Sequence, residues 1–147
     1  MRQTTTRNAR NVQEVGQEMY RMAESYATDL GSLALLSFQE FFDHVKRIGY
    51  RKEPGRFQFL ARQSWTQNGI GPIIACANKA ILIGSWAYLH KLPYRFVAVS
   101  RFRNKPLSHV FAQVYINGNW QNADATYSWH QPFQNREFER MEVLRRK

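Results

Sequence analysis

The amino-acid sequence predicts an α+β domain in which helices pack on an antiparallel sheet. In the first half of the chain, apolar residues recur at three- and four-residue spacing, which is typical of amphipathic helices. A nearly continuous apolar segment at 74–90 favours a buried helix. The next part alternates apolar and polar residues around an Asn-Gly pair, which is typical of two strands joined by a tight turn.

The composition is that of one globular domain with an excess of positive charge. The chain has 147 residues, 44% of them hydrophobic, with 21 Lys+Arg against 11 Asp+Glu and a net charge of +10. The charge favours non-specific contact with a polyanion, either nucleic acid or an acidic membrane surface. The polar N-terminal stretch does not predict a signal peptide, and no apolar run predicts a transmembrane segment.

The N-terminal half predicts a tail and two helices. Residues 1–10 offer little to bury, so we expect a flexible basic tail there and a single domain over 11–147. Apolar residues at helical spacing predict a helix over 12–30. We expect Ser32 to cap a second helix that continues to about residue 48.

The C-terminal half predicts the buried helix, at least three strands and a last helix. The segment 57–65 is ambiguous, with a short helix as one interpretation. After the buried helix, the run 94–102 predicts a strand, and 107–127 predicts a hairpin. After Trp129 the chain is polar and basic, and four spaced apolar residues are interpreted as anchors of a final helix over the core: Phe133, Phe138, Met141 and Leu144.

The Asn117-Gly118 pair determines the register of the hairpin, because a type I′ turn needs positive φ at both central positions. Side chains alternate along each strand, so His109 and Asp124 become diagonal neighbours on one face, with Cα atoms about 7–8 Å apart. The other face carries apolar residues that suit a core: Val110, Ala112, Val114, Ile116, Ala123 and Ala125.

The only cysteine, Cys76, lies near the predicted start of the buried helix, directly after a Gly/Pro loop. Unpaired N–H groups and the partial positive charge at a helix N-terminus favour a thiolate. A cysteine there, a histidine on one strand and an aspartate on the next correspond to nucleophile, base and orienting acid. The candidate catalytic residues are therefore Cys76, His109 and Asp124. A buried structural cysteine is the alternative interpretation.

Two segments resemble transglutaminase-like domains, a papain-related fold with a Cys-His-Asp triad. They are CANKAILIGSWAYLHKLPYRFVAVS (76–100) and HVFAQVYINGNWQNADAT (109–126). The resemblance implies that the buried cysteine helix packs on the antiparallel sheet after a helical N-terminal part. The residues that fall on the family's pattern, in order, are Cys76, Arg95, His109, Phe111, Gln113, Trp120, Asp124 and Thr126.

The resemblance implies a cysteine acyl-transfer enzyme (a protease, deamidase or cross-linker) that forms a thioester on Cys76 with a protein or peptide substrate. It also implies an upstream oxyanion donor, for which Trp65, Gln67 and Asn68 are candidates. The compact size, helical N-terminal part and basic character are similar to transglutaminase-like proteins encoded among bacteriophage virion genes.

Two other functions stay open. The family usually has a glycine two residues before its nucleophile, where this chain has Ile74. This difference and the positive charge favour a structural or interaction protein of the same fold, such as a basic virion component. The third hypothesis is a general polyanion-binding module. We expect no metal and no cofactor, since no glycine-rich phosphate loop follows a strand and three histidines lack ligand-like spacing: His44, His90 and His130.

Overall fold

The structure is a computed structural model that describes residues 4–8, 12–51, 57–70, 74–128, 130–133 and 137–146. It combines helices with antiparallel sheet, as the sequence predicts. The elements are β1 (Thr4–Asn8), α1 (Val12–Ser25), the 3₁₀ segment η1 (Ala27–Leu35), α2 (Phe38–Arg47), β2 (Phe57–Ala61), α3 (Gln63–Thr66), α4 (Cys76–Leu89), β3 (Tyr94–Ser100), β4 (His109–Ile116), β5 (Asn119–Ala123) and β6 (Arg140–Val143).

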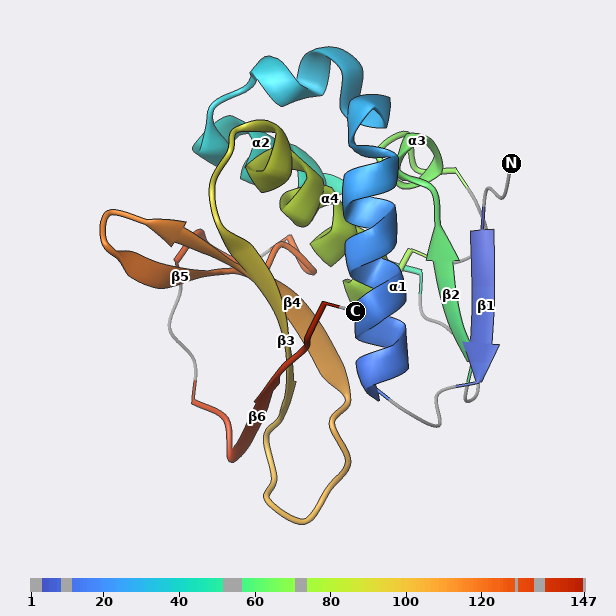
Figure 1. The fold of residues 1–147 in the computed structure, drawn as a ribbon, viewed down its shortest axis with the longest axis vertical. Coiled ribbons are helices and arrows are strands. Elements are labelled where there is room, and N and C mark those ends of the chain that lie inside the picture. The colour runs from blue at the N-terminus through green and yellow to red at the C-terminus, as the bar shows by residue number, and fades with distance from the viewer. Residues whose placement is uncertain are drawn as a thin grey trace.

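Two sheets flank the helices. The larger sheet has the strand order β5-β4-β3-β6, and β1 and β2 form a separate two-stranded sheet. Figure 1 shows the larger sheet on one side of α1 and the β1-β2 pair on the other. No helix in the described ranges is long and apolar enough to cross a membrane.

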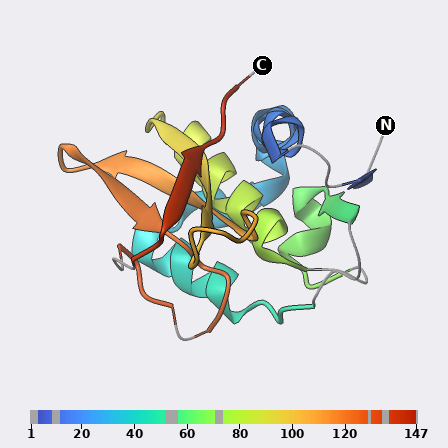
Figure 2. The same cartoon turned by 90° about the horizontal axis from the view of Figure 1, so that it is seen from below.

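Helix α4 forms the centre of the core and confirms the predicted buried helix. It packs against β4 on one side and α1 on the other, and Figure 2 shows it between the larger sheet and α1. Gly84 allows this close approach, because a Cβ atom there would lie 2.8 Å from the Phe96 ring and 3.0 Å from the Tyr94 ring. The position of Cys76 is therefore set by a helix that is held on two sides.

The hairpin of β4 and β5 has the predicted register. Ile116 pairs with Asn119, and the pairing continues to Ala112 opposite Ala123. The two turn residues have the positive φ values that a type I′ turn requires, 57° at Asn117 and 82° at Gly118. The predicted apolar face packs in the core, with its last member, Ile116, partly buried.

The N-terminal helices end and begin elsewhere than predicted. Helix α1 stops at Ser25, and η1 follows with a break at Gly31, where φ is 56°. Helix α2 is capped by Ser37 and not by Ser32: the Ser37 hydroxyl accepts the Glu40 N–H at 3.2 Å, and the Glu40 carboxylate accepts the Ser37 N–H at 3.0 Å. This reciprocal capping box decides where the helix starts.

Residues 4–8 form β1, where we expected a flexible tail. This strand pairs antiparallel with β2, which occupies the first part of the ambiguous segment 57–65. The short helix α3 follows at 63–66. Backbone pairing between segments about fifty residues apart stabilises both strands, and local side-chain periodicity gives no signal for it.

The predicted final helix is wrong, because the segment forms the edge strand β6. It pairs antiparallel with β3, with Val97 opposite Val143. Beyond the strand, Leu144 is buried in the main core, whereas Met141 is 57% exposed and anchors nothing. The unpaired edge of β3 supplies backbone partners that a helix would have left unused, and this favours the strand.

Candidate functional site

Cys76 is the first residue of α4 and is half-buried. A residue of the first turn caps the start of the helix, because the Asn78 side-chain carbonyl accepts a hydrogen bond from the backbone N–H of Ala75 at 3.2 Å. The Cys76 side chain thus lies beside the N–H groups of the first turn, where a negative charge is stabilised.

His109 and Asp124 are in direct contact, as the hairpin register predicts. His109 is the first residue of β4, and Asp124 directly follows β5. The His109 Nε2 lies 2.7 Å from Asp124 Oδ2. A bond at Nε2 leaves Nδ1 as the ring nitrogen available to a thiol, so the carboxylate fixes the orientation of the imidazole.

The Asp124 carboxylate is buried, and Thr126 and His130 also approach it. The Thr126 hydroxyl donates to Oδ1 at 2.6 Å, and the Thr126 N–H donates to the same atom at 3.2 Å. A second histidine, His130, is buried with its Nδ1 3.5 Å from Oδ1. That Nδ1 lies equally far from the backbone nitrogen of Tyr127, so its tautomer decides which contact becomes a hydrogen bond.

The electrostatics favour a charged pair. Burial alone would lower the pKa of His109. Hydrogen bonds to Asp124 and Cys76, and the negative charges of these two groups, have a larger opposite effect and raise the pKa from 6.5 to about 10. Burial raises the pKa of Asp124, but hydrogen bonds from His109, His130 and Thr126 outweigh it and hold that pKa well below its usual range. At neutral pH the His109 ring is therefore an imidazolium and Asp124 is a carboxylate.

A small, mostly apolar cavity of about 130 Å³ is lined by both Cys76 and His109. The two side chains meet there although 33 residues separate them along the chain. The polar residues that line the cavity include Ser108 and His109, at the start of β4 and just before it. The lining residues are Val12, Val15, Met19, Cys76, Ala98, Leu107, Ser108, His109, Val110 and Leu144.

Lys79 lies beneath the site as a buried cation. Its side chain is 1% exposed, and its ammonium donates to the carbonyl oxygens of Ile48 at 2.6 Å and Thr126 at 2.8 Å. Burial lowers its pKa to about 8, although the charge of Asp124 acts in the opposite direction. Lys79 therefore connects the cysteine helix to the segment that carries the acid.

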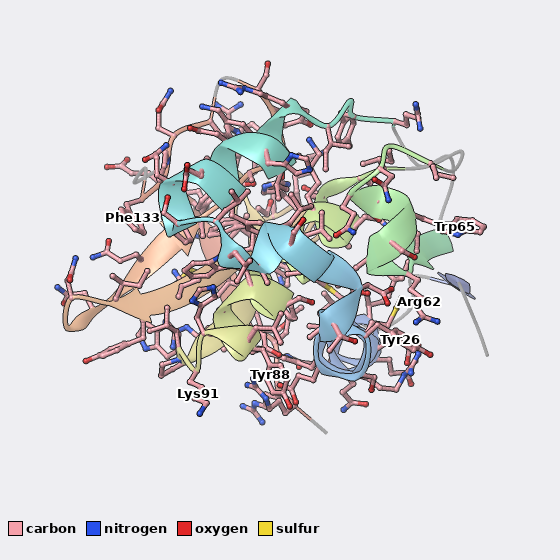
Figure 3. The ribbon with its side chains drawn as sticks, turned by 90° about the horizontal axis from the view of Figure 1, so that it is seen from above. Tyr26, Arg62, Trp65, Tyr88, Lys91 and Phe133 are labelled. Atoms are coloured by element: carbon pink, nitrogen blue, oxygen red, sulfur yellow. The ribbon has the colours of Figure 1, made fainter. Side chains whose placement is uncertain are left out.

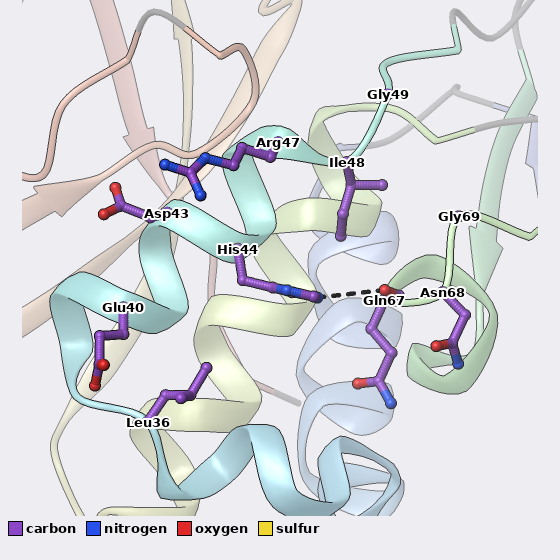
Figure 4. Close-up of a pocket in the computed structure, with 10 residues that line it drawn as sticks. All are labelled: Leu36, Glu40, Asp43, His44, Arg47, Ile48, Gly49, Gln67, Asn68 and Gly69. Atoms are coloured by element: carbon purple, nitrogen blue, oxygen red, sulfur yellow. Dashed lines mark hydrogen bonds between the residues drawn. The ribbon is translucent and has the colours of Figure 1, made fainter.

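The three oxyanion candidates do not reach the cysteine cavity. Gln67 donates its amide N–H to the Asp29 carbonyl at 2.7 Å, and Asn68 donates to the Ser64 carbonyl at 2.7 Å. Figure 4 shows both beside His44 around a different cavity, of about 600 Å³. Trp65 projects outward from α3 at the edge of the molecule (Figure 3). The backbone N–H of Cys76, at the start of α4, remains a candidate oxyanion donor.

Other positions of the resembling pattern form a polar row on the outer face of the sheet. Arg95 donates to the Gln113 side-chain oxygen at 2.8 Å, and Gln113 donates to Asn122 at 2.9 Å. The Arg95 guanidinium lies 4.2 Å from the centre of the Trp120 ring. These contacts hold β3, β4 and β5 together and so support the ends that carry His109 and Asp124.

Sequence reasoning missed His130 and Lys79. His130 was set aside because it lacks ligand spacing with the other histidines, and its approach to Asp124 depends on the loop after β5. Lys79 did carry a signal: a lone cation inside an otherwise apolar helix requires internal partners.

Comparison with known proteins gives one similar structure. No protein-family model matches the chain, and no curated protein sequence matches it. A solved structure described as "a Putative Cysteine Protease from Cytophaga hutchinsonii" is 16% identical, covers 93% of this chain and 51% of that chain, and has a TM-score of 0.43. The chain spans about half the length of that protein, and at this level of similarity the reaction of one protein says nothing about the other.

Proposed function

We propose that this protein is a cysteine acyl-transfer enzyme of transglutaminase-like type, with Cys76 as nucleophile, His109 as general acid–base and Asp124 as the orienting acid. The observation that carries the proposal is the position of His109. Its Nε2 is held at 2.7 Å by a buried carboxylate, and its ring lines the same small cavity as the only thiol. The raised pKa of His109, about 10, favours an imidazolium beside a thiolate.

The reaction follows from this geometry. The Cys76 thiolate attacks the carbonyl carbon of a carboxamide or peptide, a C–S bond forms, and the carbonyl electrons move to oxygen, beside the Cys76 N–H. The C–N bond then breaks, and His109 gives its proton to the departing amine, which leaves a thioester. Water or a second amine attacks the thioester, His109 takes a proton from it, and the thiolate is released.

Water as acceptor makes the protein a protease or deamidase, and an amine makes it a cross-linker. The cavity around the sulfur is mostly apolar and small, which suits one side chain of a protein or peptide substrate.

Alkylation with iodoacetamide tests the proposal, because Cys76 is the only thiol in the chain. We expect fast labelling at pH 7 and at least a tenfold slower rate in His109→Ala. His44→Gln is the matched control, since His44 lines the other cavity and should leave the rate unchanged. Slow labelling that is equal in the wild type and His109→Ala would contradict the enzyme and favour a structural protein of the same fold.

Formation of the thioester is the second readout. Incubation with p-nitrophenyl acetate should add one acetyl group to Cys76 in intact-mass spectra, and hydroxylamine should remove it. The Cys76→Ser protein should show neither the fast addition nor a burst of nitrophenol.

A further inference from the structure

The β3–β4 loop, residues 101–106, carries the densest positive charge next to the cysteine cavity. It contains Arg101, Arg103 and Lys105, and no acidic residue. Arg103 contacts Glu139 at 3.6 Å, with both side chains exposed, whereas no carboxylate of the described residues pairs with Arg101 or Lys105. A weak exposed contact of this kind leaves most of the loop's charge available.

The loop adjoins the candidate catalytic histidine. Val99, at the end of β3, pairs with His109 at the start of β4, so the loop spans only the residues between these partners. The chain leaving the loop, Leu107 and Ser108, lines the cavity that contains Cys76. Figure 1 shows the loop projecting beyond the ends of β3 and β4.

The loop backbone is held in place. Lys105 N–H donates to the Phe102 carbonyl at 3.3 Å, and Phe102 N–H donates to the Ser100 hydroxyl at 3.2 Å. From β6, the Arg140 side chain donates to the Lys105 carbonyl at 2.7 Å. A loop ordered before binding loses less entropy when a partner docks on it.

The same loop exposes an aromatic anchor. Phe102 is 59% exposed, between Arg101 and Arg103. Aromatic and arginine side chains together are enriched at protein interfaces. The cavity is small and its walls are mostly apolar, so residues that flank the reactive group of a substrate would contact the protein outside the cavity.

We infer that the 101–106 loop binds acidic residues that flank the reactive group of the acyl donor, so that the substrate is an acidic polypeptide segment. This inference rests on the proposed function. Nucleic acid fits the charge equally, but it offers no carboxamide or peptide carbonyl to the adjacent thiol, and the polypeptide is therefore the favoured partner.

A pair of charge-matched variants tests the inference. Arg101→Gln/Lys105→Gln removes one arginine and one lysine from the loop. The control variant, Arg47→Gln/Lys91→Gln, removes one arginine and one lysine elsewhere. Arg47 is the last residue of α2 and lines the other cavity (Figure 4). Lys91 (labelled in Figure 3) follows the C-terminal end of α4, about 20 Å along the helix from Cys76 at its N-terminal end. All four side chains are exposed, so both variants should fold.

The first readout is the rate at which Cys76 reacts with dianionic 5,5′-dithiobis(2-nitrobenzoate), divided by its rate with neutral 4,4′-dithiodipyridine. We expect the loop variant to lower this ratio about fivefold at 10 mM salt and about twofold at 100 mM, because salt screens the charges of the loop. The control should change it much less. An equal change in both variants would overturn the inference.

The second readout is binding of a fluorescein-labelled decapeptide of alternating Glu and Gln, measured by anisotropy. We expect several-fold weaker binding by the loop variant only, and slower iodoacetamide labelling of Cys76 when the peptide is bound. Preferential binding of a thymidine decanucleotide, with no peptide protection of Cys76, would overturn the inference in favour of nucleic acid. Slow, His109-independent labelling would overturn the proposed function instead, and is measured separately.

Discussion

The ammonium of Lys79, one helical turn after Cys76, donates a 2.8 Å hydrogen bond to the carbonyl of Thr126, two residues after Asp124. Cys76 and Asp124 are thus connected through a buried cation as well as through His109. A second bond, to the Ile48 carbonyl at 2.6 Å, fixes the same ammonium to the end of α2. The geometry of the site therefore depends on three segments that meet at one side chain.

Lys79→Met should destabilise the protein by about 1–3 kcal/mol, measured by urea unfolding. The methionine keeps the bulk but leaves buried carbonyls without their donor, and this loss exceeds the relief of removing a desolvated charge. Lys91→Met is the control, because Lys91 is exposed. An unfolding free energy within about 0.5 kcal/mol of the wild type would show that the carbonyls find other partners.

The pH dependence of stability should have two parts. The folded protein holds the His109 proton up to about pH 10, whereas the unfolded chain loses it near pH 6.5, so this contribution falls as pH rises between these values. Lys79 acts oppositely: its folded pKa is about 8 against 10.5 in the unfolded chain, so its contribution rises above pH 8. The two nearly cancel between pH 8 and 10.

Urea unfolding from pH 6 to 10 checks these signs. The wild type should lose stability from pH 6.5 to 8 and change little above pH 8. His109→Gln should lose the first phase and gain stability above pH 8, and Lys79→Met should decline through the whole range. Parallel curves for all three proteins would contradict both shifts.

Thr126→Val should slow the alkylation of Cys76 several-fold. The Thr126 hydroxyl donates a 2.6 Å bond to the buried Asp124 carboxylate, and a hydrogen bond to a charged group contributes about 1.5–3 kcal/mol. Thr126→Ser keeps the donor and loses only a methyl group, so its rate should stay near the wild type. Equal rates in both variants would show that Asp124 keeps its position without the hydroxyl.

Gly84→Ala should destabilise the protein by about 1–2 kcal/mol in thermal or urea unfolding. Alanine favours a helix by up to about 1 kcal/mol. The added Cβ would, however, lie 2.8 Å from the ring of fully buried Phe96, and overpacking of this kind costs about 1–3 kcal/mol. Gly49→Ala is the control and should be nearly neutral, because apart from its chain neighbours nothing lies within 4 Å of a Cβ atom built there. A stabilised Gly84→Ala protein would show that α4 can shift away from β3.

The register of the hairpin could be predicted because the Asn117-Gly118 turn signal is local. This register places His109 and Asp124 on the same face of the hairpin, and the two side chains are in contact at 2.7 Å. The buried helix was predictable because nearly all of its residues are apolar. Long-range partners had no such local signal: β1 and β2 pair across the chain, and the segment around Met141 takes up the edge of β3.

The site was predictable only in its central residues. Cys76 and His109 were identified by residue type and by the elements that carry them, whereas the environment of Asp124 depends on the loop that brings His130 to it. Gln67 was a reasonable amide donor in sequence, but its amide serves the Asp29 carbonyl in the fold. A side chain's competing backbone partners cannot be read before the fold is known.

The half-buried cysteine has no second cysteine in the chain to react with. A thiolate stabilised beside an imidazolium is susceptible to peroxide, and the first product is a sulfenic acid. With no resolving thiol in the same chain, that product can return to the reduced state only through a thiol from another molecule, such as glutathione. Under the proposed function, exposure to oxidants would therefore stop the reaction at Cys76 until an external reductant reaches the cavity.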